Sequence, residues 1–259
     1  MKRHLVAAIA CRNQGSRLYG KPIQNLDVEK GIRIIDNIVD CLRSIHCIDE
    51  IVLGISEGIE NEVFKYIAEE KGLRYVVGDQ IDVLSRLIKC GQLANASDIF
   101  RVTSESPFLC FEYVEKLWNR HKEEEADATF LDDVIDGCGF EIITLKALEK
   151  SHAKGEDRHR SELCTLYIRE QNHSFKIIRP KVPKELNRKD LRLTVDNPED
   201  LAICRTVYNA FKDQAPKIPV AEIIKFLDRN PKLIEQIAPF TEIGYSTMNI
   251  KILSNDSNH

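Results

Sequence analysis

The sequence predicts an α/β fold with a mainly parallel β-sheet that helices cover on both faces. Short apolar runs typical of buried strands alternate with segments in which apolar residues recur at helical spacing. Strands that alternate with helices of this length usually pair in parallel. At 259 residues, the chain is also long enough to bury one large core.

The first half of the chain alternates regularly between the two patterns. Apolar runs predict strands at residues 5–11, 50–55, 73–77 and 98–103. Helical spacing of apolar residues predicts helices at residues 32–45, 63–67 and 83–93. Strands and helices therefore follow one another as they do in a parallel sheet.

The second half is less regular. Helices are predicted at residues 111–124 and 161–169, and strands at residues 128–131, 140–144, 175–178 and 191–195. A further helix should run from Asn197 to about Phe211. Asn197 suits its N-cap, Pro198 suits its first position, and acidic residues follow in its first turn.

The chain changes character after residue 212. Two prolines interrupt it, a helix is predicted at residues 220–227 with another after it, and residues 254–259 form a polar tail. We therefore expect one large domain over residues 1–212. A short helical extension and a flexible tail should occupy residues 213–259.

The composition argues against several classes of protein. A net charge of −4 gives no support to a nucleic-acid surface, and no run approaches the roughly 20 apolar residues of a membrane span. The eight cysteines contain no Cys-x-x-Cys pair, and the histidines show no metal-binding spacing. We expect buried free thiols in a reducing cytoplasm, and histidines at the surface or in loops.

The basic loop, residues 12–23, directly follows the first predicted strand. Arg12, Arg17 and Lys21 supply three cations, and two glycines let the main chain come close to a ligand. Free backbone N–H groups at the carboxyl ends of strands can turn toward an anion. The loop therefore predicts a polyphosphate site, although a solvated turn with incidental cations is the structural alternative. It matches neither the Walker loop nor the Gly-x-Gly-x-x-Gly dinucleotide loop.

Three acidic residues follow other predicted strands, and each has a simple structural alternative. Asp82 suits the first turn of a helix, and Glu105 could face solvent at a strand end. Asp196 could cap the helix that follows it, although Asn197 fits that place better. Carboxylates at the ends of strands can nevertheless reach a ligand over the edge of the sheet.

The basic loop resembles the signature loop of the cytidylyltransferases that make CMP-activated acidic sugars. Within this superfamily of CMP-KDO synthetases and acylneuraminate cytidylyltransferases, the chain looks most like the spore coat polysaccharide biosynthesis protein F branch. The matching residues are Arg12, Arg17, Leu18, Gly20 and Lys21. Tyr19 stands where proline is usual in the family.

Other segments extend the resemblance, in the family's order, to about residue 212. Residues 78–86 resemble the family segment that faces the nucleotide base, and residues 101–109 resemble the segment whose aspartate helps to hold magnesium. Residues 191–201 resemble the segment whose first aspartate is a magnesium ligand. Residues 136–141 and 160–168 are weaker matches to segments expected near the acceptor.

The chain departs from the family pattern at further positions, and Ser161 stands where the family has an arginine unless Arg160 or His159 substitutes by a shift. Ser104 replaces a glycine, Glu105 replaces the aspartate, and Leu163 stands at the family histidine. The extra methylene of glutamate moves the carboxylate outward by about 1.5 Å, and magnesium tolerates little distortion of its ligands. Metal binding by Glu105 and the identity of the acceptor are therefore open.

The resemblance implies a three-layer α/β/α, Rossmann-like nucleotidyltransferase fold with a mixed, mainly parallel sheet, in which residues 1–212 form the nucleotidyltransferase domain. It implies Mg²⁺-dependent transfer of CMP from CTP to an acidic sugar, a nonulosonic acid or KDO-like sugar, with release of pyrophosphate. Such a reaction would serve surface polysaccharide or glycan biosynthesis. Two alternatives stay open: a phosphorylated or phosphonate acceptor that is not a sugar, and a nucleotide-binding scaffold whose catalysis has decayed.

The resemblance also assigns roles to individual residues. It makes Arg12, Lys21 and Asp196 the expected catalytic residues, and Glu105 and Asp196 the expected magnesium ligands. The expected nucleotide-binding residues are Ala10, Cys11, Arg12, Gly15, Ser16, Arg17, Lys21, Gly78, Asp79, Asp82, Arg86, Thr103 and Ser104. The expected acceptor-binding residues are Glu141, Glu162 and Tyr167. We further expect a homodimer that acts on CTP and a small acidic acceptor, with neither nucleic-acid nor membrane partners.

Overall fold

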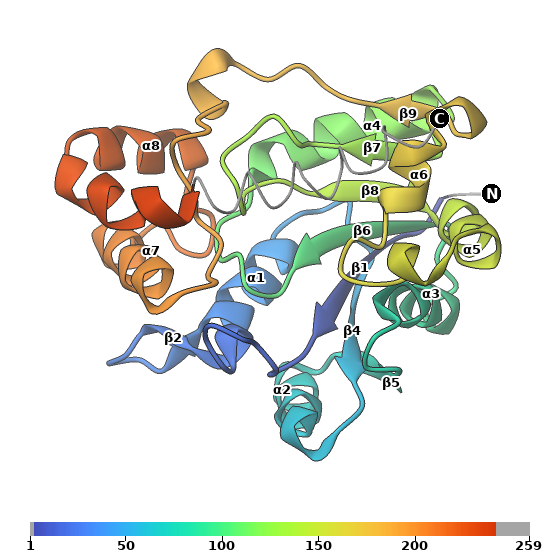
Figure 1. Ribbon diagram of the computed structural model, residues 1–259, viewed down its shortest axis with the longest axis horizontal. Helices are drawn as coiled ribbons and strands as arrows, with labels where there is room; N and C mark the ends of the chain where they lie inside the picture. The colour runs from blue at the N-terminus through green and yellow to red at the C-terminus, as the bar shows by residue number, and fades with distance from the viewer. Residues whose placement is uncertain (1–2, 242–259) are drawn as a thin grey trace.

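The computed structural model describes residues 3–241, and its centre is a seven-stranded sheet between two layers of helices (Figure 1). The strands of this sheet are β1 (Leu5–Cys11), β4 (Glu50–Ser56), β5 (Arg74–Gly78), β6 (Asp98–Thr103), β7 (Ala128–Phe130), β8 (Glu141–Thr144) and β9 (Ile177–Ile178). Their order across the sheet is β5-β4-β1-β6-β8-β7-β9. A separate antiparallel pair consists of β2 (Asn25–Asp27) and β3 (Ile32–Arg33).

Most of the sheet is parallel, as the sequence predicts. β1 pairs in parallel with β4 on one side and β6 on the other, and β4 pairs in parallel with β5. β8 runs antiparallel to its neighbours β6 and β7, while β9 is parallel to β7. The carboxyl ends of β5, β4, β1 and β6 and the amino end of β8 therefore lie on one edge of the sheet. We call it the carboxyl edge.

The helices form the two outer layers. They are α1 (Ile34–Arg43), α2 (Val63–Lys71), α3 (Val83–Leu93), α4 (Val114–Glu123), α5 (Leu145–Lys154), α6 (Leu166–Glu170), α7 (Pro198–Ala210) and α8 (Val220–Asp228). Short 3₁₀ helices lie in the connections: η1 (Lys21–Ile23), η2 (Ile59–Asn61), η3 (Phe111–Tyr113), η4 (Asp157–His159), η5 (Asn172–Ser174) and η6 (Lys184–Leu186). No helix within residues 3–241 is long and apolar enough to cross a membrane.

Successive side chains of β1 divide the core between the two faces of the sheet. Leu5, Ala7 and Ile9 are fully buried in one apolar cluster with side chains of α1, α2, α4, α7 and α8. Val6 and Ala8 are fully buried in the other, with side chains of α3, α5 and α6. This alternation follows from the period of two along a strand. It confirms the expected three-layer α/β/α arrangement.

The predicted strand at residues 191–195 is wrong. The backbone N–H groups of Leu193 and Val195 donate to the carbonyls of Asp136 (2.8 Å) and Glu105 (3.0 Å), which lie in loops. Only an isolated bridge joins Asp136 to Arg192. The segment has the apolar alternation of a strand, but its hydrogen-bond partners are loop residues and not the sheet.

The predicted helix at residues 161–169 begins only at Leu166. Arg101 donates to the carbonyl of Glu162 (3.1 Å), and the N–H of Leu166 bonds to the carbonyl of Leu163. In a continuous helix the N–H of Leu166 would bond to the carbonyl of Glu162. The side chain of Arg101 occupies that carbonyl instead. The other predicted strands and helices within the described residues are confirmed, with small shifts at their ends.

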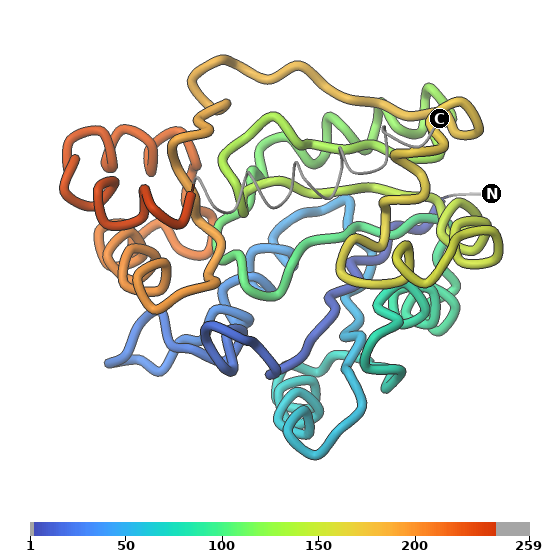
Figure 2. The backbone as a smooth tube through the Cα atoms, in the orientation of Figure 1, coloured from blue at the N-terminus to red at the C-terminus, as the bar shows by residue number. Residues whose placement is uncertain are grey.

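The segment after α7 packs onto the same core as the large domain. Ile223 and Leu227 of α8 and Ile237 are fully buried in the apolar cluster that contains α1 and β1. Phe226 of α8 also packs edge-on against Phe211, with ring centroids 5.7 Å apart. Residues 231–241 form a further helix, and Figure 2 shows this part of the chain in red beside the orange of α7. The predicted tail at residues 254–259 lies outside the described residues.

The cysteines lie where the sequence predicts, whereas two of the histidines do not. All eight cysteines are free thiols, buried in every case except the half-buried Cys47, as expected. The expectation that histidines lie at the surface or in loops is wrong for His121 and His159, which are buried. His121 satisfies its ring nitrogens through Asp98 (3.2 Å) and Thr129 (2.8 Å), so its polar atoms are paired in the interior.

Candidate active site

The basic loop leaves the end of β1 at the carboxyl edge and closes on itself. The N–H of Gly20 donates to the carbonyl of Asn13 (2.8 Å), and Gly20 has a φ of 63°, a left-handed conformation that favours glycine. A Cβ on Gly15 would lie 2.3 Å from the carbonyl oxygen of Leu18. Glycine is therefore required at both positions for the loop to fold back.

A pair of buried asparagines anchors this loop to the next strand-to-helix connection. The N–H of Asn13 donates to the Oδ1 of Asn61 (2.8 Å), and the Nδ2 of Asn61 donates to the carbonyl of Glu57 (3.1 Å). Neither asparagine was identified from the sequence. The sequence offers one hint of Asn13, a polar residue between the first strand and the loop glycines. That hint does not identify Asn61 as its partner.

Three cations from two parts of the chain converge on the carboxylate of Asp196. Lys21 donates from Nζ to Oδ1 at 2.6 Å, and a guanidinium nitrogen of Arg17 lies 3.3 Å from Oδ2. Arg192 donates to the same Oδ2 at 2.8 Å. The side chain of Asp196 is 22% exposed and that of Lys21 is 19% exposed. Lys21, Arg17 and Asp196, all predicted site residues, therefore meet in one half-buried cluster.

The backbone of Asp196 is fixed by the helix that follows. Asp200, at the third position of α7, accepts hydrogen bonds from the N–H groups of Asp196 (3.0 Å) and Asn197 (2.8 Å). Asn197 is the N-cap residue, as predicted. Burial opposes ionisation of Asp196, but the hydrogen bond from Lys21 and the surrounding positive charges hold its pKa below the ordinary value. The carboxylate of Asp196 is therefore charged near neutral pH.

Glu105 reaches the same region through its main chain. Its carbonyl accepts the N–H of Val195 (3.0 Å), which places Glu105 beside the residue that precedes Asp196. Its carboxylate accepts a hydrogen bond from the hydroxyl of the buried Ser104 (3.2 Å). Two predicted metal ligands thus come from adjacent stretches of backbone.

The donor atoms suit a magnesium ion that arrives with a substrate. Residues 3–241 contain no group of three or more His, Cys, Asp or Glu side chains that could hold a metal by themselves. Magnesium usually takes one or two protein carboxylates and completes its shell with waters and phosphate oxygens. Asp196 and Glu105 offer such hard oxygen donors, so the residues present fit a magnesium ion shared with phosphates.

Arg86, a predicted nucleotide-binding residue, lies beside the ends of β1 and β4. Its side chain is among the largest fully buried ones, and its Nη1 donates to the carbonyls of Gly54 (2.8 Å) and Cys11 (3.2 Å). Burial lowers the pKa of Arg86. The guanidinium thus joins the ends of β4 and β1. The predicted contact of Arg86 with nucleotide stays a prediction.

The two aspartates before α3 support local structure. Asp79 accepts from the N–H groups of Ile81 (2.7 Å) and Asp82 (2.8 Å), and these bonds lower its pKa. Asp82 caps α3 by accepting from the N–H of Ser85 (2.7 Å) and lies 2.7 Å from a ring nitrogen of His152. A capped helix start is therefore present, but Asp82 is the N-cap itself and does not lie in the first turn. Nucleotide binding by either aspartate stays a prediction.

Glu141, a predicted acceptor-binding residue, has hydrogen-bond partners on both of its carboxylate oxygens. Its Oε2 accepts from Arg101 (2.8 Å), and its Oε1 accepts from Arg169 (2.6 Å) and from the hydroxyl of Thr165 (2.9 Å). Burial opposes ionisation, yet the two guanidinium groups lower the pKa of Glu141 from 4.5 to about 2. Arg101 and Arg169 were not among the predicted site residues. Only the presence of Arg101 at the end of a strand could have indicated it.

Glu162 and Tyr167 are the other two residues predicted to bind the acceptor. Glu162 forms an ion pair with Arg12, which links the basic loop to the segment before α6. Tyr167 lies edge-on to the rings of His159 (5.3 Å) and Phe175 (6.1 Å). The structure therefore brings Arg12 and Glu162 together and holds Tyr167 between two edge-on aromatic contacts.

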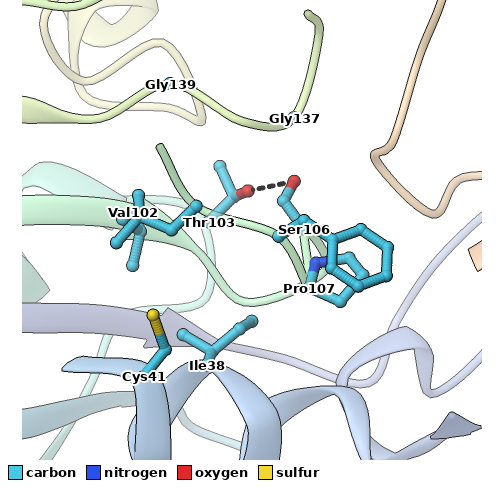
Figure 3. Close-up of a pocket in the computed structure, with 10 residues that line it drawn as sticks. Ile38, Cys41, Val102, Thr103, Ser106, Pro107, Gly137 and Gly139 are labelled. Atoms are coloured by element: carbon cyan, nitrogen blue, oxygen red, sulfur yellow. Dashed lines mark hydrogen bonds between the residues drawn. The ribbon is translucent and has the colours of Figure 1, made fainter. Parts of the chain in front are cut away.

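A small cavity lies behind the end of β6. It is lined by Ile38, Cys41, Val102, Thr103, Ser106, Pro107, Phe108, Leu109, Gly137 and Gly139, and Figure 3 shows the hydroxyl of Thr103 donating to that of Ser106 (2.7 Å). The space available to a water-sized molecule is about 10 Å³, enough for about one water. Neither a nucleotide nor a sugar fits there.

Comparison with known families decides the class of the protein. The model of the cytidylyltransferase family matches residues 6–239, which is most of the chain. The chain belongs to the cytidylyltransferase family. It is therefore a nucleotidyltransferase, and the family resemblance noted in its motifs is confirmed.

Individual relatives of this cytidylyltransferase are distant. It is 25% identical to spore coat polysaccharide biosynthesis protein SpsF of Bacillus subtilis over 86% of this chain and 93% of the relative. It is also 25% identical to an uncharacterized protein of Methanocaldococcus jannaschii, over 88% of this chain and 92% of the relative.

Solved structures support the fold of this cytidylyltransferase. A cytidylyltransferase from Leptospira borgpetersenii superimposes with a TM-score of 0.78 at 20% identity, over 90% of this chain and 97% of that one. A CMP:2-keto-3-deoxy-manno-octonic acid synthetase solved with CTP gives a TM-score of 0.59 at 14% identity, over 80% and 99% of the two chains. These matches confirm the Rossmann-like nucleotidyltransferase fold.

Proposed function

We propose that this cytidylyltransferase transfers CMP from CTP to an acidic sugar, with release of pyrophosphate, in the biosynthesis of a surface polysaccharide or glycan. The observation that carries the proposal is the convergence of Lys21 and Arg17 on Asp196 at the carboxyl edge. Membership in the family supports the CTP half of the reaction. The name of the SpsF relative supports the polysaccharide half.

The basic loop would hold the triphosphate. The side chains of Arg12 and Arg17 are both more than a third exposed, and that of Lys21 is partly exposed. A polyphosphate could therefore exchange with the carboxylates that these cations now face, and each cation would form a charge-assisted hydrogen bond to it. The same cations would stabilise the negative charge that develops on the leaving pyrophosphate.

The transfer is an in-line displacement at the α-phosphorus. An acceptor oxygen forms a bond to the α-phosphorus while the bond from that phosphorus to the bridging oxygen breaks. The electron pair of the broken bond leaves with pyrophosphate, and the acceptor hydroxyl gives its proton to water. Lys21 and the loop arginines act by positioning and charge, so no covalent intermediate on the protein is needed.

We propose Asp196, with Glu105, as the ligands of a magnesium ion that accompanies the triphosphate. When bound, magnesium would neutralise phosphate charge and acidify the acceptor hydroxyl. Asp196 now shares its oxygens among three cations. Its carboxylate would become free for a metal ion as Lys21 and Arg17 turn toward phosphate.

Further proposals concern assembly and location. We infer a homodimer, a cytoplasmic site of action, and a nucleotidyltransferase domain over residues 1–212 with a helical extension after it. The buried free thiols support a reducing compartment. Light scattering at several protein concentrations would test the dimer, and a monomer at every concentration would contradict it.

Pyrophosphate release with each of the four nucleoside triphosphates tests the function most directly. The acceptor panel contains nonulosonic acids, KDO-like sugars, phosphorylated metabolites and phosphonates, with and without magnesium. We expect turnover only with CTP, magnesium and one of the acidic sugars. Turnover on a phosphorylated or phosphonate acceptor would overturn the sugar assignment. Magnesium-dependent CTP binding without any turnover would indicate a scaffold.

A further inference from the structure

We propose that Arg192 is a positioning residue for Asp196, and that it couples the C-terminal helix, residues 231–241, to the reacting edge of the sheet. The proposal rests on the proposed function, because it gives Asp196 its role toward the metal and the triphosphate. Arg192 itself would touch neither substrate. It acts through the carboxylate that it holds.

The guanidinium of Arg192 contacts two nearby residues of its own segment and one residue of the C-terminal helix. Its Nη2 donates to the Oδ2 of Asp196 (2.8 Å), and its Nη1 donates to the main-chain carbonyl of Phe240 (2.8 Å). Its Nε lies 3.2 Å from the Oδ1 of Asp200, an ion-pair distance without hydrogen-bond alignment. The side chain is 1% exposed. The planar, rigid guanidinium fork lets one cation hold two acceptors by hydrogen bonds and a third by charge.

Asp200 completes the support from the other side. It accepts the N–H of Asp196 (3.0 Å), while Arg192 holds the carboxylate of the same residue. Both the main chain and the side chain of Asp196 are thus fixed by one buried ion pair. The loop cations are different, because Lys21 and Arg17 approach Asp196 from the more exposed side.

This asymmetry gives the cations different tasks. Lys21 and Arg17 can leave Asp196 for a phosphate, since both belong to the basic loop at the open edge. Arg192 cannot follow them, because it is buried, hydrogen-bonded to the carbonyl of Phe240 and ion-paired with Asp200. When the loop cations turn to the triphosphate, Arg192 would keep the carboxylate of Asp196 in place for the metal.

The C-terminal helix supplies the third corner of this arrangement. Ile237 and Thr241 of this helix are buried, and the hydroxyl of Thr241 donates to the carbonyl of Ile237 (3.0 Å). The helix therefore sets the place of the Phe240 carbonyl and, through it, the orientation of the guanidinium. The extension is then part of the catalytic machinery and not an appendage.

The test compares Arg192→Met and Arg192→Lys with the matched control Arg188→Met in the full chain. Arg188 also bonds to the C-terminal part of the protein, through Asp228 of α8 (2.8 Å), and its other partner is Asp190. Titration calorimetry measures the affinity for CTP at increasing magnesium concentrations. It gives the concentration at which magnesium has produced half of its full increase in that affinity. Hydrogen exchange of peptides from residues 231–241 is followed with and without CTP and magnesium.

We expect Arg192→Met to raise the required magnesium concentration at least tenfold, with Arg192→Lys between it and wild type and Arg188→Met unchanged. In the wild type, CTP with magnesium should slow exchange in residues 231–241, and Arg192→Met should abolish that protection. If Arg192→Met does not fold, Arg192→Lys and the wild-type exchange decide the outcome.

Two results would overturn the proposal. A folded Arg192→Met with the wild-type magnesium requirement would exclude the positioning role. Exchange in residues 231–241 that does not respond to CTP and magnesium in the wild type would exclude the coupling. If the wild type binds no CTP at all, the proposed function itself fails, which is a separate and recognisable result.

Discussion

Lys21 and Asp196, which lie 175 residues apart in the sequence, form an ion pair in which Nζ is 2.6 Å from Oδ1. The pair closes the basic loop onto the segment that precedes α7. It unites two motifs that the sequence presents separately. A cation suited to phosphate and a carboxylate suited to magnesium therefore start in contact, and the arrival of a metal-bound triphosphate would have to separate them.

Replacing Lys21 by alanine should lower turnover roughly 100-fold, the usual effect of removing one preorganised donor to a developing charge. The loss of stability should be only about 1 kcal/mol, because Asp196 keeps Arg17 and Arg192 as partners. Steady-state pyrophosphate release and urea unfolding measure the two effects. The control is Lys65→Ala, because Lys65 lies on α2 and pairs with Glu62, the N-cap residue of that helix. A folded Lys21→Ala with the wild-type rate would show that the loop does not hold the reacting phosphates.

Asp196→Asn should separate metal dependence from nucleotide affinity. The amide removes the negative charge that a hard cation needs, so magnesium should enhance CTP binding much less and turnover should fall by roughly 100-fold or more. Without metal, CTP should bind more tightly than to the wild type, because Lys21 and Arg17 no longer face a competing carboxylate. Calorimetry with and without magnesium checks both. Asp190→Asn, which alters an exposed pair with Arg188, is the control. An unchanged magnesium titration in Asp196→Asn would exclude it as a ligand.

Glu105 tests whether the metal uses two carboxylates. If it is a ligand, Glu105→Asp should keep or gain activity and Glu105→Gln should lose it and need more magnesium, because only the charged oxygen suits the ion. Circular dichroism checks that both variants fold. A fully active Glu105→Gln, with Glu105 turned away from the metal in a crystal of the wild type with CTP and magnesium, would leave Asp196 as the single carboxylate.

The cluster around Glu141 should give acid-sensitive stability. Glu141→Gln should lower the free energy of unfolding by about 3 kcal/mol at pH 7, since it leaves Arg101 and Arg169 without their buried partner. The folded pKa of about 2 lies below the ordinary 4.5. The stabilisation is therefore fully present above about pH 4.5 and is lost as the pH falls toward 2.

Urea unfolding of the wild type and Glu141→Gln from pH 7 to pH 2 measures this dependence. The difference between them should stay constant down to about pH 4.5 and then narrow. The control is Glu124→Gln, whose glutamate forms an exposed pair with Arg120 on α4. A difference of the same size at pH 7 and pH 2 would show that the charge of Glu141 contributes nothing to the effect of the substitution.

The sequence revealed those features of the site that depend on local pattern. The apolar run before Arg12 located the first strand, and the proline after Asn197 located the start of α7, because period and capping chemistry are local. The saturation of Glu141 could not be foreseen, since Arg101 and Arg169 reach it from distant segments. The sequence also could not show that residues 191–195 lie outside the sheet. An alternating apolar pattern looks the same whether the N–H groups of the segment bond to a strand or to a loop.

Because β8 runs in the reverse direction, Glu141 and the basic loop reach the carboxyl edge from different parts of the fold. The parallel strands β1, β4 and β5 carry the basic loop and the ends joined by Arg86, whereas Glu141 enters the same edge from the opposite chain direction. Under the proposed function, substitutions in residues 128–178 would remodel the acceptor side while the hydrogen bonds between β1 and β4 stay intact. Acceptor choice could then diverge among relatives without any change in how the nucleotide is held.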